Sequence, residues 1–348
     1  MSSPQPATFG DTELAVVLSH YELGVIESIR PFGKGSRKSP KVAVVCERGK
    51  FLLKRRAPAR ADHDRVRIAH AVQKHLLENG FPAARLIPAR GDGRTVVQLR
   101  GDVYELFEFT PGRLFDQSTV EARDAGVMLA GLHAATAELG PQWSGPRGSY
   151  HDLPGVRSGL CAIGSQIQAH DSCAGNEAEL ASLTQFLLET YDKAAAAVNA
   201  LGWFSWPERV SHGDWHPGNL LFRKHRVVAV IDFDSVRLTK RIMDVANGAL
   251  QFSMMAGDDP DHWPSGLDED RFAAFLDGYS SASPVSHEEV LAIVHLMAEA
   301  LIAECVPPIS ETGSVGRWSG FRVLRMVRRK LTWLAANHDR LLGCVARP

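Results

Sequence analysis

The chain has 348 residues, 45% hydrophobic and 23% charged, so it can bury a sizeable core and is expected to form two lobes or domains. Its net charge of −1 gives no global electrostatic reason to bind nucleic acid or a membrane, and no apolar run reaches transmembrane length. The five cysteines include no CxxC pair and no signal peptide is evident, which predicts reduced thiols in a cytoplasmic protein.

Three short apolar or β-branched segments near the start of the chain predict successive strands, at 24–30, 41–46 and 51–54. The loop between the first two contains Gly33, Gly35 and Ser36 among basic side chains. Backbone donors and positive charges of this kind suit a loop that covers phosphates. Only two glycines occur in it, so an ordinary flexible hairpin loop is the alternative.

Lys54 ends the third predicted strand, whose other residues are apolar. An ammonium group in a buried strand is costly without an anionic partner, and the phosphates of a nucleotide would provide one. Arg55 and Arg56 follow directly, so a solvated basic cluster is the alternative.

Beyond Lys54 the pattern predicts one helix and two further strands, which complete a five-stranded lobe: 62–79, 96–99 and 103–109. The segment 108–112 then changes from an apolar strand to a Pro-Gly linker and is the best candidate for a domain boundary. We therefore expect two lobes, over 1–109 and 110–348.

The composition becomes helical after this boundary. Apolar residues recur at helical spacing in six segments: 120–139, 177–201, 241–255, 271–279, 288–305 and 322–336. The larger lobe is therefore predicted to be mostly α, with 140–155 as its main irregular insertion. The last of these helices carries a basic face, which is either solvated or able to attract an anionic partner.

Two carboxylates and an amide occur within 210–234 in the order that phosphoryl transfer needs. Asp214 lies in a short predicted loop, where its carboxylate would accept a hydrogen bond and then a proton from a substrate hydroxyl. Asn219 offers an amide oxygen, and Asp232 follows a predicted buried strand. Mg²⁺ prefers oxygen ligands and usually takes one or two carboxylates, so both residues suit it.

The two predicted ligands are thirteen positions apart, but the sequence between them predicts a hairpin. Apolar segments at 220–222 and 227–231 flank a short polar run. Antiparallel strands would bring Asn219 and Asp232 together. Asp234 follows closely and has two interpretations, as an assistant to the metal or as a cap of the next segment.

These motifs, His212-Gly213-Asp214 with Asn219 and Ile231-Asp232-Phe233-Asp234, resemble those of the aminoglycoside phosphotransferase and choline kinase-like family. The resemblance implies an α+β, protein-kinase-like two-lobed fold. Its N-terminal nucleotide-binding lobe, 1–109, would be a small five-stranded antiparallel sheet with one helix. Its C-terminal catalytic and substrate-binding lobe, 110–348, would be larger and mostly helical. The resemblance also implies ATP and Mg²⁺ as cofactors, Asp214 as the catalytic base, and Asn219 and Asp232 as metal ligands.

The resemblance assigns further roles outside this block. It implies that Lys54 holds the α- and β-phosphates of ATP. It also implies a hinge in which the backbone of Glu108 and Thr110 pairs with the adenine edge, although a simple strand exit explains the same residues. Asp244 resembles the structural aspartate of the family, which braces the catalytic loop.

The predicted helix over 62–79 departs from the kinase pattern, because it has no mid-helix glutamate to pair with Lys54. Asp64 and Glu78 are the nearest acids by sequence. Either one of them substitutes through a shifted helix, or phosphate alone orients the lysine. A catalytically inactive nucleotide-binding or scaffold protein is therefore one alternative function.

The expected acceptor is a hydroxyl group of a small molecule: an amino alcohol, an amino sugar, an aminoglycoside or a hydroxylated amino acid. Six acids are candidates to receive its amine, with ordinary surface acidity as the alternative: Asp258, Asp259, Asp261, Asp268, Glu299 and Glu304. A protein serine/threonine kinase is a second alternative, but Asp244 follows Asp232 by only twelve positions, which leaves no recognisable activation loop.

Overall fold

The computed structural model describes residues 8–33, 39–58, 61–91, 93–169 and 175–345. The chain forms two compact units. The first unit takes the described residues of Met1–Leu114, Ser144–Pro146 and Asn219–Val236, and the second unit takes those of Phe115–Trp143, Arg147–Gly218 and Arg237–Pro348. These units differ from the predicted lobes mainly because Asn219–Val236 packs with the N-terminal residues.

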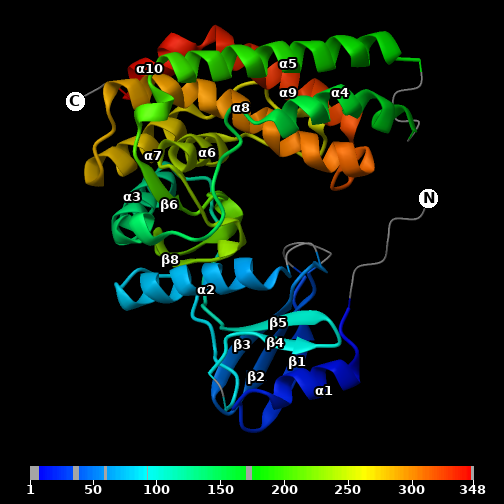
Figure 1. Ribbon diagram of the computed structural model, residues 1–348, viewed down its shortest axis with the longest axis vertical. Coiled ribbons are helices and arrows are strands. Elements are labelled where there is room, and N and C mark those ends of the chain that lie inside the picture. Colours follow the sequence, from blue (N-terminus) through cyan, green and yellow to red (C-terminus); the bar gives the residue numbers. More distant parts are fainter. Residues whose placement is uncertain (1–7, 34–38, 59–60, 92, 170–174, 346–348) are drawn as a thin grey trace. The chain divides into compact units, whose positions relative to one another are not determined.

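A five-stranded antiparallel sheet forms the centre of the first unit (Figure 1), which confirms the predicted fold class. Its strands are β1 (Ile26–Pro31), β2 (Lys41–Cys46), β3 (Gly49–Arg55), β4 (Val97–Leu99) and β5 (Asp102–Glu108). They lie in the order β1-β2-β3-β5-β4. Along β2, buried and partly buried residues alternate, as expected for a strand with one face in the core.

Two helices cover the sheet, one on each face (Figure 1). α1 (Asp11–Ser19), which the sequence analysis did not predict, buries Val17 in a cluster with Leu53 of β3 and Leu106 of β5. α2 (His63–Glu78) lies within the predicted range of 62–79 and begins after Asp62, whose side chain accepts a hydrogen bond from the backbone of Arg65 and caps the helix.

The predicted hairpin is confirmed: β7 (Leu220–Arg223) pairs antiparallel with β8 (Arg226–Val230). Lys224 and His225 both have positive φ, at 50° and 60°, as in a two-residue turn that follows the twist of the strands. The backbone N–H of Val230 donates to the carbonyl of Pro82, and its carbonyl accepts from the N–H of Ala84, which ties the hairpin to the N-terminal part of the first unit. A short 3₁₀ helix, η5 (Phe233–Ser235), follows and contacts α2.

The second unit is mostly helical (Figure 1). Its α-helices are α3 (Thr119–Ala135), α4 (Pro154–Ala169), α5 (Glu177–Ala200), α6 (Ile242–Ser253), α7 (Glu269–Ala282), α8 (His287–Thr312), α9 (Gly320–Ala336) and α10 (His338–Val345). It also has the strand pairs β6 (Glu208–Ser211) with β9 (Arg237–Lys240) and β10 (Ser314–Val315) with β11 (Trp318–Ser319), and the 3₁₀ helices η2 (Ala137–Gln142), η3 (Trp203–Ser205) and η6 (Pro260–His262). The sequence analysis missed α4 and α10.

α8 corrects the expectation that no segment reaches transmembrane length, because its length and composition pass that test. Two thirds of the apolar stretch is buried inside the protein, however. The helix contacts α4, α5, α6 and α9 (Figure 1), so it packs as a core helix of the second unit.

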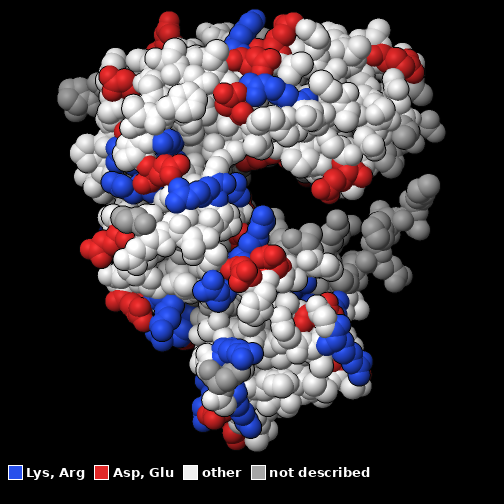
Figure 2. Space-filling view, in the orientation of Figure 1, with Lys and Arg blue, Asp and Glu red and all other residues white. Residues whose placement is uncertain are grey.

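The basic face of α9 is engaged by the chain itself. Arg322 pairs with Asp259 and, at 2.6 Å, with Asp261. Lys330 is buried and donates a hydrogen bond to the carbonyl of Pro264 at 2.9 Å. Charges of both signs are interspersed over the face in Figure 2, as the net charge of −1 suggests.

Candidate active site

Lys54 is buried in the first unit among three carboxylates. Its Nζ lies 3.1 Å from Asp234, 3.4 Å from Asp232 and 3.9 Å from Glu105. Burial alone would lower the pKa of this ammonium group, but the charges of Glu105, Asp232 and Asp234 raise it above its ordinary value. Lys54 therefore keeps its charge inside the fold, and the interpretation as a solvated basic cluster is wrong for this residue.

Glu105 is the acid that the sequence analysis missed. It lies on β5 directly opposite Lys54 of β3 in the antiparallel register, so both side chains leave the same face of the sheet. Asp64 and Glu78, the two candidates on α2, instead form exposed pairs with Arg67 and Lys74. Neither substitutes for the missing mid-helix glutamate.

A buried network surrounds Glu105. Its Oε1 pairs with Arg56 and lies 2.6 Å from Nε2 of His70 on α2. Burial would raise the pKa of the Glu105 carboxyl, but the hydrogen bond from His70 and the charges of Lys54 and Arg56 lower it below its usual value. Arg56 also pairs with Asp234, so the last acid of the Asp-Phe-Asp motif is an ion-pair partner of both Arg56 and Lys54.

The hairpin places Asn219 next to the end of β8, since the backbone N–H of Ile231 donates to the carbonyl of Asn219 at 3.0 Å. Asp232 follows at once and has a left-handed backbone with φ 62°. Such a conformation is uncommon outside glycine and is often found at functional sites. The first unit thus brings together Lys54, Asn219 and Asp232.

The donor set of Asn219 and Asp232 fits Mg²⁺. One amide oxygen and one carboxylate, close together on a hairpin, are hard oxygen ligands of the number that protein sites usually supply to this ion. The carboxylate of Asp232 is about one third exposed, so water and phosphate oxygens have access to it.

The other predicted nucleotide contacts are only partly described. Gly33 lies two residues beyond the end of β1 and is exposed, whereas Gly35 and Ser36 lie outside the described residues. Glu108 ends β5, with its N–H donating to the carbonyl of Arg85 at 2.9 Å, and Thr110 follows it. The hinge role of Glu108 and Thr110 stays a prediction.

Asp214 belongs to the second unit, where Asp244 braces its loop as predicted. The two carboxylate oxygens of Asp244 accept hydrogen bonds from the backbone N–H groups of His212, at 2.7 Å, and Gly213, at 2.9 Å. His133 of α3 lies 3.4 Å from the same carboxylate. The loop that carries Asp214 is therefore fixed by backbone hydrogen bonds to a buried charge.

Glu304 is the predicted acid that interacts with Asp214. Gln251 of α6 donates to both oxygens of its carboxylate at 2.8 Å. Although the side chain is open to solvent, the crowding of protein atoms and the charge of Asp214 raise the pKa of Glu304 to about 7. An ammonium group bound there would relieve the repulsion between the two carboxylates.

Four of the other five acid candidates have structural partners. Asp259 and Asp261 pair with Arg322, and Asp268 caps α7 by accepting a hydrogen bond from the backbone of Arg271 at 2.9 Å. Glu299 is fully buried and lies 2.9 Å from Nδ1 of His151. Of the six acids considered, Glu304 is thus the best placed to bind an acceptor.

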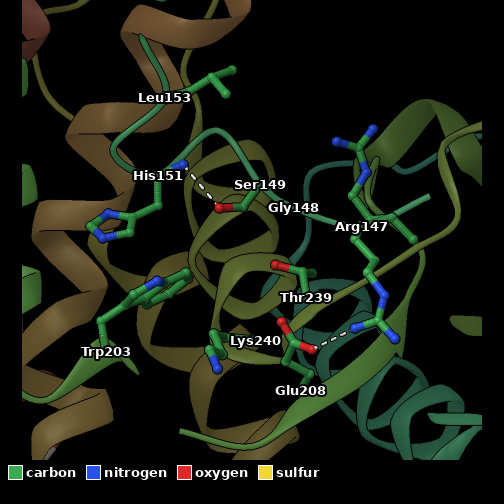
Figure 3. A pocket seen from close by; sticks show the side chains of 10 residues that line it. Arg147, Gly148, Ser149, His151, Leu153, Trp203, Glu208, Thr239 and Lys240 are labelled. Atoms are coloured by element: carbon green, nitrogen blue, oxygen red, sulfur yellow. Dashed lines mark hydrogen bonds and ion pairs between the residues drawn. The ribbon is translucent and has the colours of Figure 1, made fainter. Parts of the chain in front are cut away.

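A separate pocket of about 400 Å³ opens in the second unit (Figure 3). Arg147 and Glu208 pair at 3.1 Å in its wall, and the rings of His151 and Trp203 pack 4.2 Å apart. Its lining includes none of the predicted catalytic or metal-binding residues. The pocket is therefore distinct from the part of the second unit that holds Asp214.

Residues 28–293 match the phosphotransferase enzyme family. The chain is 23% identical over 284 residues to a homoserine kinase of Methylocella silvestris, an alignment that covers 81% of this chain and 80% of the relative. Among other curated relatives that it matches, the chain spans 56% of a stress response kinase A from Shigella flexneri and 65% of a homoserine kinase from Zymomonas mobilis.

Solved structures share the fold over nearly the whole chain. An amicoumacin kinase in complex with AMP-PNP and Ca²⁺ superposes with a TM-score of 0.67 at 13% identity, covering 93% of this chain and 94% of the other. A microcompartment-associated aminopropanol kinase gives a TM-score of 0.67 at 17% identity, with 97% and 99% covered. At these identities the similarity establishes a common fold.

Proposed function

The chain belongs to the phosphotransferase enzyme family, and we propose that it is a kinase that uses ATP and Mg²⁺ to phosphorylate a hydroxyl group of a small, amine-bearing metabolite. The observation that carries the proposal is the arrangement in the first unit. A buried ammonium group, Lys54, lies 3.4 Å from Asp232, the carboxylate that follows the β7–β8 hairpin. Phosphoryl transfer depends on this combination of a cation for the phosphates and oxygen ligands for a metal.

Each residue has a physical task in the proposed reaction. Asp214, on a loop that Asp244 holds in place, accepts a hydrogen bond from the acceptor hydroxyl and orients it for attack. Lys54 donates to the phosphates of the nucleotide. Asn219 and Asp232 would hold Mg²⁺, which supplies charge neutralisation on the transferred phosphoryl group when bound.

The acceptor class follows from Glu304. Its carboxylate, oriented by Gln251 and interacting with Asp214, would bind an ammonium group and so position a hydroxyl of the same molecule near the base. Two similar proteins are named for homoserine and aminopropanol, which both carry an amine and a hydroxyl group. The proposal covers amino alcohols, amino sugars, aminoglycosides and hydroxylated amino acids.

The two alternative functions receive less support. Between Asp232 and the start of α6 the chain forms only η5 and β9, so a protein kinase activation loop has no place there. The alternative of a catalytically inactive protein was based on the absence of a mid-helix glutamate to pair with Lys54. Glu105 supplies a carboxylate 3.9 Å from this lysine.

The test is release of ADP from ATP in the presence of Mg²⁺ and a panel of amino alcohols, amino sugars, aminoglycosides, homoserine and simple sugars. We expect stimulation by an amine-bearing acceptor, and Asp214→Ala to lower kcat by about 10²–10⁴-fold with little change in nucleotide affinity. Full turnover by Asp214→Ala would contradict the mechanism. A wild-type protein that binds ATP but responds to no acceptor would favour the inactive or protein kinase alternatives.

A further inference from the structure

The lysine of the first unit has its acid partner on a strand and not on the helix where the kinase pattern expects it. Lys54 and Glu105 face each other across β3 and β5, with Nζ 3.9 Å from Oε2. The sheet register fixes this pair, since a slip of one strand by one residue would turn its side chain to the opposite face and separate the two groups.

Glu105 is short of one hydrogen bond. Its Oε1 receives Arg56 and His70, whereas its Oε2 is buried and has no hydrogen-bond donor among the residues that the structure describes. A buried carboxylate oxygen without a donor is unfavourable. Lys54 needs to move by only about 1 Å to donate to it, since a hydrogen bond of this type is ~2.8 Å long.

His70 links this carboxylate to α2. It lies in the middle of the helix, and its Nε2 is 2.6 Å from Glu105 while its Nδ1 is 2.6 Å from the hydroxyl of Thr95. A carboxylate only accepts hydrogen bonds, so Nε2 donates and Glu105 is tied to the helix through the ring. The histidine thus occupies the helix position at which a direct acid partner is missing.

We propose that Glu105 is the positioning residue that holds Lys54 for the phosphates of the nucleotide, with His70 connecting it to α2. Lys54 has three N–H donors. One donates to Asp234 and one would donate to Glu105, which leaves the third, whose partner in the structure is Asp232 at 3.4 Å, as the one that an anionic ligand would share. The proposal rests on the function proposed above, because it assumes that the ligand is a nucleotide.

The test compares Glu105→Gln, which keeps the size of the side chain and removes its charge, with Glu78→Gln, which does the same to an exposed acid of α2. Calorimetric titration with AMP-PNP and Mg²⁺ measures affinity, and steady-state kinetics separates the KM values for ATP and for the acceptor. We expect Glu105→Gln to lower kcat/KM for ATP by about 100-fold, the size of effect that a misplacement of about 1 Å produces, and to weaken AMP-PNP binding. The KM for the acceptor should stay the same, as should every value for Glu78→Gln.

A charge-relocation variant separates positioning from packing. Glu105→Gln combined with His70→Glu returns the acid to the helix, and we expect it to recover most of the lost nucleotide affinity. Unchanged nucleotide affinity and kinetics in Glu105→Gln would overturn the proposal. So would a folded double variant that binds as weakly as the single one. Absence of turnover by the wild type would instead contradict the proposed function, while the AMP-PNP titrations would still decide the role of Glu105.

Discussion

Replacing Asp244 with Asn should destabilise the second unit and displace the catalytic loop. The carboxylate is 3% exposed and accepts hydrogen bonds from two backbone N–H groups, those of His212 and Gly213. An amide has only one oxygen, so its NH₂ group must face one of these donors and leave it buried without a partner. A hydrogen bond to a charged group contributes about 1.5–3 kcal/mol and an unsatisfied buried donor costs about 1–3 kcal/mol, so we expect a loss of about 3 kcal/mol.

Tryptophan fluorescence is a suitable assay, because all seven tryptophans of the chain lie in the second unit. A loss of this size corresponds to a fall in Tm of about 6–12 °C, and activity should fall as the loop of Asp214 moves. Asp277→Asn is the matched control, since its exposed pair with Arg123 contributes about 0–1 kcal/mol. If Asp244→Asn unfolds at the same temperature as Asp277→Asn, the bracing of the loop by Asp244 is refuted.

Three further predictions concern helix packing and pH. Gly278→Ala should destabilise the protein by about 1–3 kcal/mol, because a Cβ there would lie 2.0 Å from the carbonyl oxygen of Arg123 on α3. Gly164→Ala on α4, where a Cβ would meet no atom within 4 Å, should stabilise the protein by about 0.5–1 kcal/mol. Urea unfolding measures both changes, and equal effects would contradict the close packing at Gly278. The KM for an amine acceptor should fall between pH 6 and 8 in the wild type, because the pKa of Glu304 is about 7 and only the ionised carboxylate attracts an ammonium group. A Glu304→Gln variant with the same pH profile of KM would argue against this site. Burial lowers the pKa of Lys330 to about 8, below its value of 10.5 in an unfolded chain. Between pH 8 and 10.5 the unfolded state therefore binds more protons, so the free energy of unfolding should rise with pH relative to that of Lys330→Met. Parallel curves of this free energy against pH for the two proteins would exclude the linkage.

Much of the fold was readable from local patterns. β2 was predicted with its observed bounds, and α2 lies within one residue of its predicted bounds at each end. α1 was missed because it begins after Gly10 without a side-chain cap, and α4 was missed because the stretch around it is rich in glycine. Local signals predict an element well when its cap and its hydrophobic period agree.

The motif residues were predictable because their chemistry lies within a few positions of the chain. Asn219 and Asp232 come together through a hairpin that the polar run 223–226 predicts, and Asp244 follows twelve positions after Asp232. Glu105 was not found, because its pairing with Lys54 depends on the register between two strands that are distant in sequence. One signal was available: Glu105 is the only charged residue in the interior of β5, and a buried charge needs a partner.

The position of Glu105 suggests how the kinase arrangement can tolerate the loss of a helix acid. A lysine on β3 needs one nearby carboxylate, and either the facing helix or the neighbouring strand can supply it, since both border the same face of the sheet. On a strand, the acid is fixed by main-chain hydrogen bonds and stays beside the lysine if the helix shifts. Here the helix keeps only an indirect link through His70, so a movement of α2 would act on Lys54 through the carboxylate and not on the lysine itself.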